Sequence, residues 1–210
     1  MRPDLDLGPQ FKKVHLSTLS SHPPIVESPN TAAHWEGLWP DETATQSFAV
    51  HLAHGLQNWP GGRDARIELR GNLGAGKTTL VRHLLRAAGV QGRIKSPTYA
   101  VVEPHQALTG DTPWPIWHFD FYRFNDPQEW EDAGFRDIFA GPGLKLMEWP
   151  DKVAGQLPPP DWVIDLEAID EDQRRVRISA QTTAGQAWLD AWLNSNPSPK
   201  PPATGALHAP

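Results

Sequence analysis

Apolar residues fall at helical spacing in several stretches of the chain, and the longest such pattern begins at Asp41. This pattern predicts a helix that frays near Gly55, and a second helix is predicted over residues 78–88 before Gly89. A short helix is predicted over residues 127–134, and an amphipathic one over residues 183–193. The expected buried positions are Thr43, Phe48, Leu52, Ala53 and Leu56, then Leu80, Val81, Leu84, Leu85 and Ala88, then Trp188, Leu189 and Trp192.

Short apolar runs bounded by turn residues predict strands between these helices. The predicted strands are residues 65–70, 98–103, 117–122, 143–149, 162–167 and 174–179, and an acidic turn joins the last two into a hairpin. In the first strand, apolar and charged residues alternate, whereas a central strand of a doubly covered parallel sheet is normally apolar on both faces. We therefore expect one face of the sheet to be thinly covered near the start of this strand.

The length of 210 residues and the hydrophobic content of 39% are enough for one core and hardly for two. The two ends are rich in proline and lack a periodic apolar pattern. We therefore expect a disordered N-terminal extension over residues 1–34, a single domain over residues 35–194, and a disordered Pro-rich tail over residues 195–210.

Charge and composition exclude several classes of function. The net charge of −6 argues against a large DNA- or RNA-binding surface. The chain has no cysteine, which excludes disulfides, thiolate zinc sites and a cysteine nucleophile. No apolar run approaches the roughly 20 residues that span a bilayer, and no signal-peptide pattern opens the chain. The expected location is the cytoplasm, with no membrane partner.

The segment from Gly71 to Thr78 matches the pattern G-x-x-x-x-G-K-[ST] at every fixed position and lies between a predicted strand and a predicted helix. Glycines let backbone N–H groups point at phosphate oxygens, and the helix N-terminus favours the same anion. The lysine can reach the β- and γ-phosphates, and the threonine hydroxyl can bind magnesium. The sequence therefore predicts a P-loop that binds a nucleoside triphosphate with Mg²⁺ through Asn72, Leu73, Gly74, Ala75, Gly76, Lys77, Thr78 and Thr79.

Two carboxylates could accompany the P-loop in holding magnesium. Asp120 and Glu148 lie near the C-terminal ends of predicted strands, where ligands bind in open α/β sheets. The sequence leaves open which of the two is the direct metal ligand. The loop over residues 95–98 could place a hydroxyl near the γ-phosphate, but spacing alone favours an ordinary loop with Thr98 beginning a strand. His118 could act as a base, although a histidine within a strand is more often a structural hydrogen-bonding residue.

Four segments together give the chain a resemblance to the TsaE (YjeE) family, the ATPases of bacterial tRNA threonylcarbamoyladenosine biosynthesis. They are GNLGAGKTT at 71–79, SPTY at 96–99, HFDFYR at 118–123 and EWPD at 148–151. The resemblance implies an α/β P-loop NTPase fold, a single domain with a mixed β-sheet flanked by helices. It also implies slow ATP hydrolysis that depends on TsaD- and TsaB-like partners, which modify adenosine 37 of tRNA, so that tRNA is reached indirectly.

The same resemblance implies roles for individual residues. Lys77 and Thr78 match the contacts with phosphate and magnesium, and Glu148 matches a magnesium-associated acid. Asp120 matches a catalytic carboxylate, Thr98 a switch-like position and Trp149 a residue of the nucleotide pocket. The predicted catalytic residues are thus Asp120, Lys77 and Thr98, and the predicted metal ligands are Thr78 and Glu148, with ATP and Mg²⁺ as cofactors.

Two other functions share the P-loop. In a small-molecule kinase, Asp120 would accept the proton of a substrate hydroxyl, but the short segment before it contains no Arg-rich lid. A GTP-dependent switch would need a guanine-reading [NT]-K-x-D motif, and the sequence contains none. We therefore expect an ATPase, with the kinase as the alternative.

Overall fold

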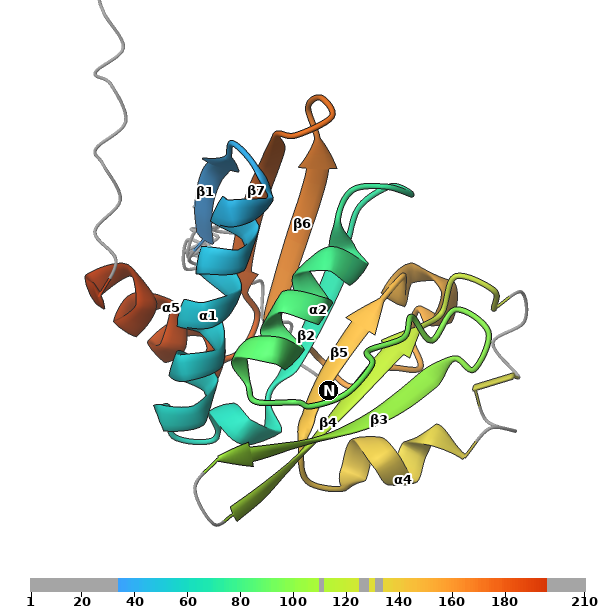
Figure 1. The fold of residues 1–210 in the computed structure, drawn as a ribbon. Coiled ribbons are helices and arrows are strands. Elements are labelled where there is room, and N and C mark those ends of the chain that lie inside the picture. Colours follow the sequence, from blue (N-terminus) through green and yellow to red (C-terminus); the bar gives the residue numbers. More distant parts are fainter. Residues whose placement is uncertain (1–33, 110–111, 125–128, 131–133, 196–210) are drawn as a thin grey trace, which may run out of the picture. The chain divides into compact units, whose positions relative to one another are not determined.

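A mixed sheet runs through the computed structural model, which describes residues 34–109, 112–124, 129–130 and 134–195 (Figure 1). Its seven strands follow the order β1-β7-β6-β2-β5-β4-β3. The central strand β2 is parallel to both of its neighbours, and β4 is parallel to β5. The remaining pairs are antiparallel. The strands are β1 (His34–Trp39), β2 (Arg66–Arg70), β3 (Val102–Thr109), β4 (Thr112–Asp120), β5 (Leu144–Glu148), β6 (Trp162–Ala168) and β7 (Arg174–Ala180).

Helices cover one face of this sheet. In Figure 1, α1 (Glu42–Asn58) and α2 (Lys77–Ala87) lie side by side across it, and α5 (Thr183–Ser195) lies next to α1. Asp41 caps the start of α1, where its carboxylate accepts a hydrogen bond from the Ala44 N–H at 2.9 Å. The inward residues of these helices and of the facing strand positions form the main hydrophobic core. Burial of this surface removes apolar area from water and is the main stabilising contribution.

A second, aromatic cluster covers the opposite face at the β4–β5 end of the sheet. Phe119 and Met147 are paired in register on this face and are fully buried. The short helix α4 (Phe135–Ala140) packs against them through Phe135, and the segment after β5, with the 3₁₀ helix η2 (Pro150–Val153), contributes Val153. The turn before β2 contains the other 3₁₀ helix, η1 (Gly62–Asp64). The carboxyl ends of β4 and β5 are therefore held between two packed layers.

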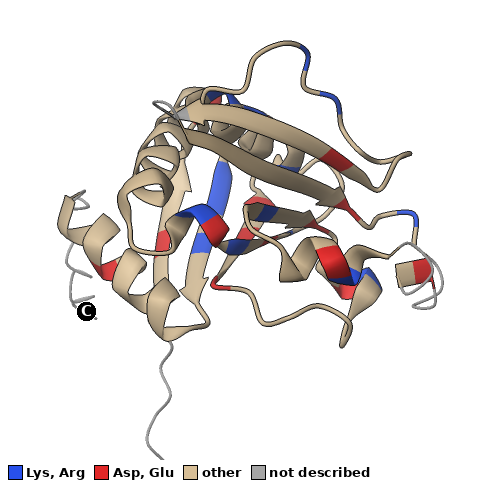
Figure 2. Ribbon diagram, turned by 90° about the horizontal axis from the view of Figure 1, so that it is seen from below, with Lys and Arg blue, Asp and Glu red and all other residues tan. Residues whose placement is uncertain are grey.

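Among the described residues, the opposite face of β6, β7 and β1 carries charged side chains and no packed helix. Arg175 forms an ion pair with Glu167 there, and Arg177 is 3.5 Å from Glu36. Figure 2 shows where the basic and acidic residues lie along the ribbon. The charged residues of β2 point to the same face. Among them, Glu68 is buried and forms an ion pair with Arg70. The thin coverage expected beside β2 thus extends over the antiparallel end of the sheet.

Several element boundaries differ from those expected. Residues 98–101 form a turn, so the expected strand over residues 98–103 is wrong for most of its length, and β3 begins only at Val102. The next strand starts at Thr112, earlier than expected. Pro113 and Pro115 lie where β4 pairs with β3 alone, before its pairing with β5 begins at Ile116, and proline is tolerated where one side of a strand is unpaired. Neither β1 nor α4 was expected.

Other expectations fall partly or wholly outside the described residues. This holds for the N-terminal extension apart from His34, for the C-terminal tail apart from Ser195, and for most of the helix expected over residues 127–134. Of that last segment, Glu129 and Trp130 are helical. Within the described ranges, no helix combines the length and the apolar character that crossing a bilayer requires.

Candidate functional site

Residues 71–78 comprise the loop between β2 and α2 and the first two residues of α2, and this segment is called the motif loop below. Its glycines are required by its backbone: Gly71, Gly74 and Gly76 have φ angles of 135°, 80° and 100°. L-residues rarely adopt such angles. A side chain on Gly71 would also collide with the Leu166 carbonyl oxygen of β6. The glycine pattern seen in the sequence therefore serves this particular backbone, which passes close to the neighbouring strand before α2 begins.

Lys77 is the first residue of α2 and lies almost wholly buried beneath the motif loop. Its ammonium donates hydrogen bonds to the carbonyl oxygens of Gly71 and Asn72, at 2.6 and 2.9 Å. It also lies 3.9 Å from the centre of the Trp149 ring. Burial lowers the pKa of Lys77, and the negative charges of Glu148 and Asp120 act against this lowering. The side chain is thus a desolvated cation held at the mouth of the loop.

Glu148 ends β5 and connects the motif loop to the strand beside it. Its Oε2 accepts a hydrogen bond from the Thr78 hydroxyl at 2.8 Å. Its Oε1 is 2.8 Å from Nε2 of His118, a fully buried residue of β4. An ionised carboxylate can only accept hydrogen bonds. With Glu148 ionised, His118 Nε2 therefore carries the proton and donates to Oε1. Thr78, Glu148 and His118 therefore form one hydrogen-bonded row.

Asp120 ends β4 and lies directly opposite Glu148 in the parallel register. Its Oδ2 accepts from the Thr98 hydroxyl at 2.6 Å, and its Oδ1 accepts from the Tyr122 N–H at 3.0 Å. The Thr98 hydroxyl is also 2.8 Å from that of Ser96. The structure thus brings Thr98 to Asp120 from a turn, and the simpler interpretation of Thr98 as the start of a strand is wrong.

Lys77, Thr78, Thr98, Asp120 and Glu148 all line one cavity of about 280 Å³, called the central cavity below. Of the residues expected at the site, Asn72 alone is not part of its wall, although its carbonyl oxygen accepts a hydrogen bond from Lys77. Sequence reasoning missed Arg174, which reaches the wall from β7, and left Tyr122 undecided. The wall consists of Leu73, Gly74, Ala75, Gly76, Lys77, Thr78, Thr79, Thr98, Asp120, Tyr122, Glu148, Trp149 and Arg174.

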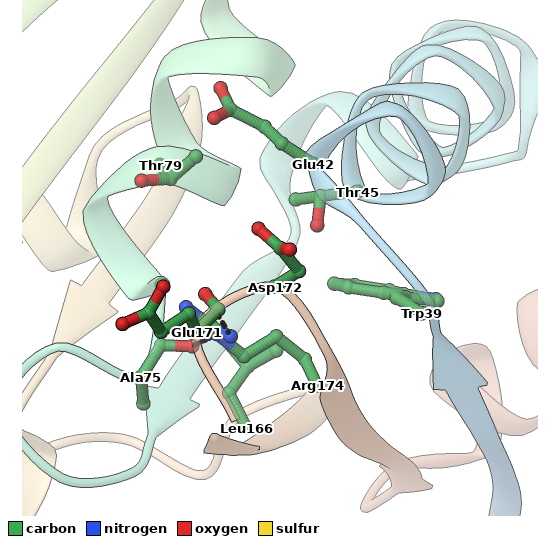
Figure 3. Close-up of a pocket in the computed structure, with 10 residues that line it drawn as sticks. Trp39, Glu42, Thr45, Ala75, Thr79, Leu166, Glu171, Asp172 and Arg174 are labelled. Atoms are coloured by element: carbon green, nitrogen blue, oxygen red, sulfur yellow. Dashed lines mark hydrogen bonds between the residues drawn. The ribbon is translucent and has the colours of Figure 1, made fainter. Parts of the chain in front are cut away.

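A second cavity, of about 120 Å³, adjoins the first along the motif loop. The two share the walls made by Ala75, Gly76, Thr79 and Arg174. Figure 3 shows its other side chains, which come from the start of α1, from Trp39 and from the turn between β6 and β7. That turn, residues 170–173, is called the acidic turn below, and it contributes Glu171 and Asp172 to the second cavity.

The central cavity offers few protein oxygen atoms for a metal ion. This suits magnesium better than an ion whose ligands all come from the protein. Among the described residues, no group of three or more His, Asp or Glu side chains is arranged to hold a metal ion. Mg²⁺ typically takes one or two protein oxygens and completes its shell with water and phosphate. The Thr78 hydroxyl and the Glu148 carboxylate supply such oxygens side by side, so these two residues would hold the ion.

His118 should contribute to stability through Glu148, and this can be measured. We expect His118→Leu to lower the free energy of unfolding by about 2–3 kcal/mol, because a buried carboxylate oxygen then loses its donor. His105→Leu is the matched control on the adjacent strand β3, because the buried His105 Nε2 has no hydrogen-bond partner among the described residues. Urea unfolding followed by circular dichroism compares the two. Equal losses would show that the Glu148 contact carries no special stability.

Comparison with known proteins agrees with this geometry. The family model described as "Threonylcarbamoyl adenosine biosynthesis protein TsaE" matches residues 39–176, which include every strand from β2 to β6 and the whole central cavity. The chain belongs to the TsaE family. The resemblance inferred from four short segments is thereby confirmed over most of the domain.

Individual TsaE proteins support the assignment. The chain is 39% identical to the tRNA threonylcarbamoyladenosine biosynthesis protein TsaE of Haemophilus influenzae, over 74% of this chain and 95% of that protein. It is 32% identical to the protein of the same name from Bacillus subtilis, over 54% of this chain and 68% of that one. The crystal structure of YdiB from Bacillus subtilis superposes with a TM-score of 0.60 and 21% identity, covering 78% of this chain and 96% of YdiB. The fold is that of P-loop NTPases, as expected.

Proposed function

We propose that this TsaE-family chain is a Mg²⁺-dependent ATPase that serves the threonylcarbamoyl modification of adenosine 37 in tRNA, together with TsaD- and TsaB-like proteins. Its relatives from Haemophilus influenzae and Bacillus subtilis are named for threonylcarbamoyladenosine biosynthesis. The acidic net charge of −6 suits a protein that acts on the modifying machinery and reaches tRNA through it.

One observation carries the ATPase proposal: the central cavity collects a buried cation, a hydroxyl and two carboxylates, each held in place by its own hydrogen bonds. Lys77 and Thr78 come from the motif loop and α2, whereas Asp120 and Glu148 come from adjacent strand ends. Phosphoryl transfer to water needs charge neutralisation at the phosphates, oxygen ligands for the metal and a group that orients the attacking water. Residues that face the same space could supply all three, which supports the proposal.

The binding step follows from the walls of the two cavities. Backbone N–H groups of the motif loop and the ammonium of Lys77 would bind the β- and γ-phosphates. Thr79 lines both cavities. With the phosphates in the central cavity, the nucleoside would lie in the second cavity, on the other side of Thr79. There, the carboxylates of Glu171 and Asp172 can accept hydrogen bonds from ribose hydroxyls or from the amino group of adenine. Thr78 and Glu148 would hold magnesium, which would neutralise part of the phosphate charge when bound.

The hydrolytic step would depend on Asp120. Its carboxylate faces the central cavity, and its direction is fixed by Thr98 and by the backbone of Tyr122. A carboxylate in this position can orient a water molecule towards the γ-phosphate and accept its proton. Thr98 sits in a turn that Ser96 and Val101 also stabilise, so a partner protein that moves this turn would move the hydroxyl bound to Asp120.

This arrangement predicts that hydrolysis by the isolated chain is slow and rises severalfold when TsaD- and TsaB-like proteins are added. The reason is that the turn carrying Thr98 lies at the cavity wall, where a partner can complete the site. Release of phosphate from ATP, measured with each protein alone and with the mixture, checks this. Rapid phosphorylation of a metabolite by the isolated chain would instead favour the kinase.

A further inference from the structure

Arg174, the first residue of β7, stands between the two cavities. Its Cα is paired with Trp39 of β1 on one side and with Ala168 of β6 on the other. Its side chain forms part of the wall of both the central and the second cavity, as Figure 3 shows for the second. Neither the motif loop nor the residues inferred from family resemblance include it.

The guanidinium of Arg174 joins two segments that are distant in sequence. Its Nε donates to the carbonyl oxygen of Ala75 in the motif loop at 3.1 Å. Its Nη1 lies within 3.1, 3.1 and 2.9 Å of the carbonyl oxygens of Asp170, Glu171 and Gln173. One side chain therefore binds the motif loop and the acidic turn at the same time.

The acidic turn is itself held in one conformation. The Asp170 carboxylate accepts from the N–H groups of Asp172 and Gln173, at 2.9 and 2.7 Å. Such side-chain-to-backbone bonds fix a turn locally. Because Arg174 ties this fixed turn to Ala75, the positions of Glu171 and Asp172 in the second cavity are set relative to the motif loop.

The same contact acts on the peptide that faces the phosphates. The carbonyl of Ala75 and the N–H of Gly76 belong to one peptide group, and a charged donor on the carbonyl polarises the N–H and strengthens it as a donor. Gly76 is required by its φ of 100° and not by Arg174, since a Cβ at this position would be in ordinary contact with the Arg174 Nε at 3.6 Å. Arg174 thus supports the anion-binding loop from its outer side.

We propose that Arg174 is a positioning residue that locks the acidic turn to the motif loop, so that the nucleoside and the phosphates of one nucleotide are bound as a unit. This rests on the proposed nucleotide binding. A planar guanidinium with donors on several sides can serve both segments, whereas the single ammonium of a lysine cannot reach all of these carbonyls. The role is therefore specific to arginine and goes beyond its charge.

The test compares ADP with inorganic pyrophosphate, which carries the same diphosphate without the nucleoside. Calorimetric titrations with Mg²⁺ would be made on the wild-type chain, Arg174→Met, Arg174→Lys and the control Arg175→Met. Arg175 is the next residue of β7, and its exposed side chain pairs with Glu167 on the open face. Thermal unfolding without ligand shows that each variant is folded.

We expect Arg174→Met to weaken ADP binding about tenfold and pyrophosphate binding by about threefold or less, so that the preference for the nucleotide falls. Arg174→Lys should show the same loss of preference, which also provides the test if the Met variant does not fold. Arg175→Met should leave both affinities unchanged. A lysine variant with wild-type preference, or equal losses for both ligands, overturns the positioning role while leaving the proposed function intact. A wild-type chain that binds neither ligand overturns both.

Discussion

Asp120→Asn should reduce ATP hydrolysis by about a hundredfold or more while ATP binding stays intact, because a general base typically contributes a rate factor of this size. The substitution keeps the shape of the side chain. Its amide oxygen can still accept from the Tyr122 N–H, and its amide nitrogen can donate to Thr98, whose hydroxyl then donates to Ser96. Only the negative charge and the ability to accept a proton are lost.

Hydrolysis would be measured with the partners present, and ATP affinity by titration of a non-hydrolysable analogue with Mg²⁺. Asp165→Asn is the matched control, because Asp165 lies on β6 beside the open face and outside the central cavity. It should change neither quantity. Wild-type turnover in Asp120→Asn would remove Asp120 from the reaction, and a parallel loss of analogue binding would assign it to the binding step instead.

Lys77→Met should weaken ATP binding by about a hundredfold, equivalent to about 3 kcal/mol. The stability of the ligand-free protein should not fall. A methionine keeps the apolar stem and a favourable sulfur contact with the Trp149 ring, and it removes a buried ammonium whose pKa is lowered by burial. The variant loses two hydrogen bonds to the carbonyls of Gly71 and Asn72. This loss is offset because a charged ammonium no longer has to be buried away from water.

Lys145→Met provides the control for burial. Lys145 is also almost fully buried and burial also lowers its pKa, but it lies on the other face of the sheet and donates to the carbonyl of Gly141. ATP titrations and thermal unfolding of both variants separate binding from stability. Equal ATP affinity in Lys77→Met and wild type would contradict the role of the motif loop, and a similar loss in Lys145→Met would point to a general effect on folding.

The parts of the site that were predictable from the sequence are those whose cause is local. The backbone angles of the motif loop require glycine at its glycine positions. The carboxylates of Asp120 and Glu148 lie at the ends of strands that apolar runs in the sequence indicate. Their pairing in register then follows from the parallel sheet.

The parts that were not predictable depend on contacts between distant segments. Arg174 meets Ala75 across 99 residues, and nothing in its own neighbourhood marks it. Thr98 looked like the start of a strand because its hydroxyl partner, Asp120, is 22 residues away, and Val101 turns the chain with a φ of 65° before β3 begins. The edge strand β1 exists through its pairing with β7, and the six residues of α4 are too few to show a helical period.

The resting position of Lys77 has a consequence for which ligands the site accepts. Because its ammonium already has two carbonyl partners and an aromatic face, an incoming anion does not meet a bare charge but must displace existing contacts. A small monovalent ion such as chloride offers too little in return. A polyphosphate offers several oxygens to the ammonium and to the loop N–H groups together, so the exchange is favourable only for it. We therefore expect the loop to select anions by their valence before any base or sugar is recognised.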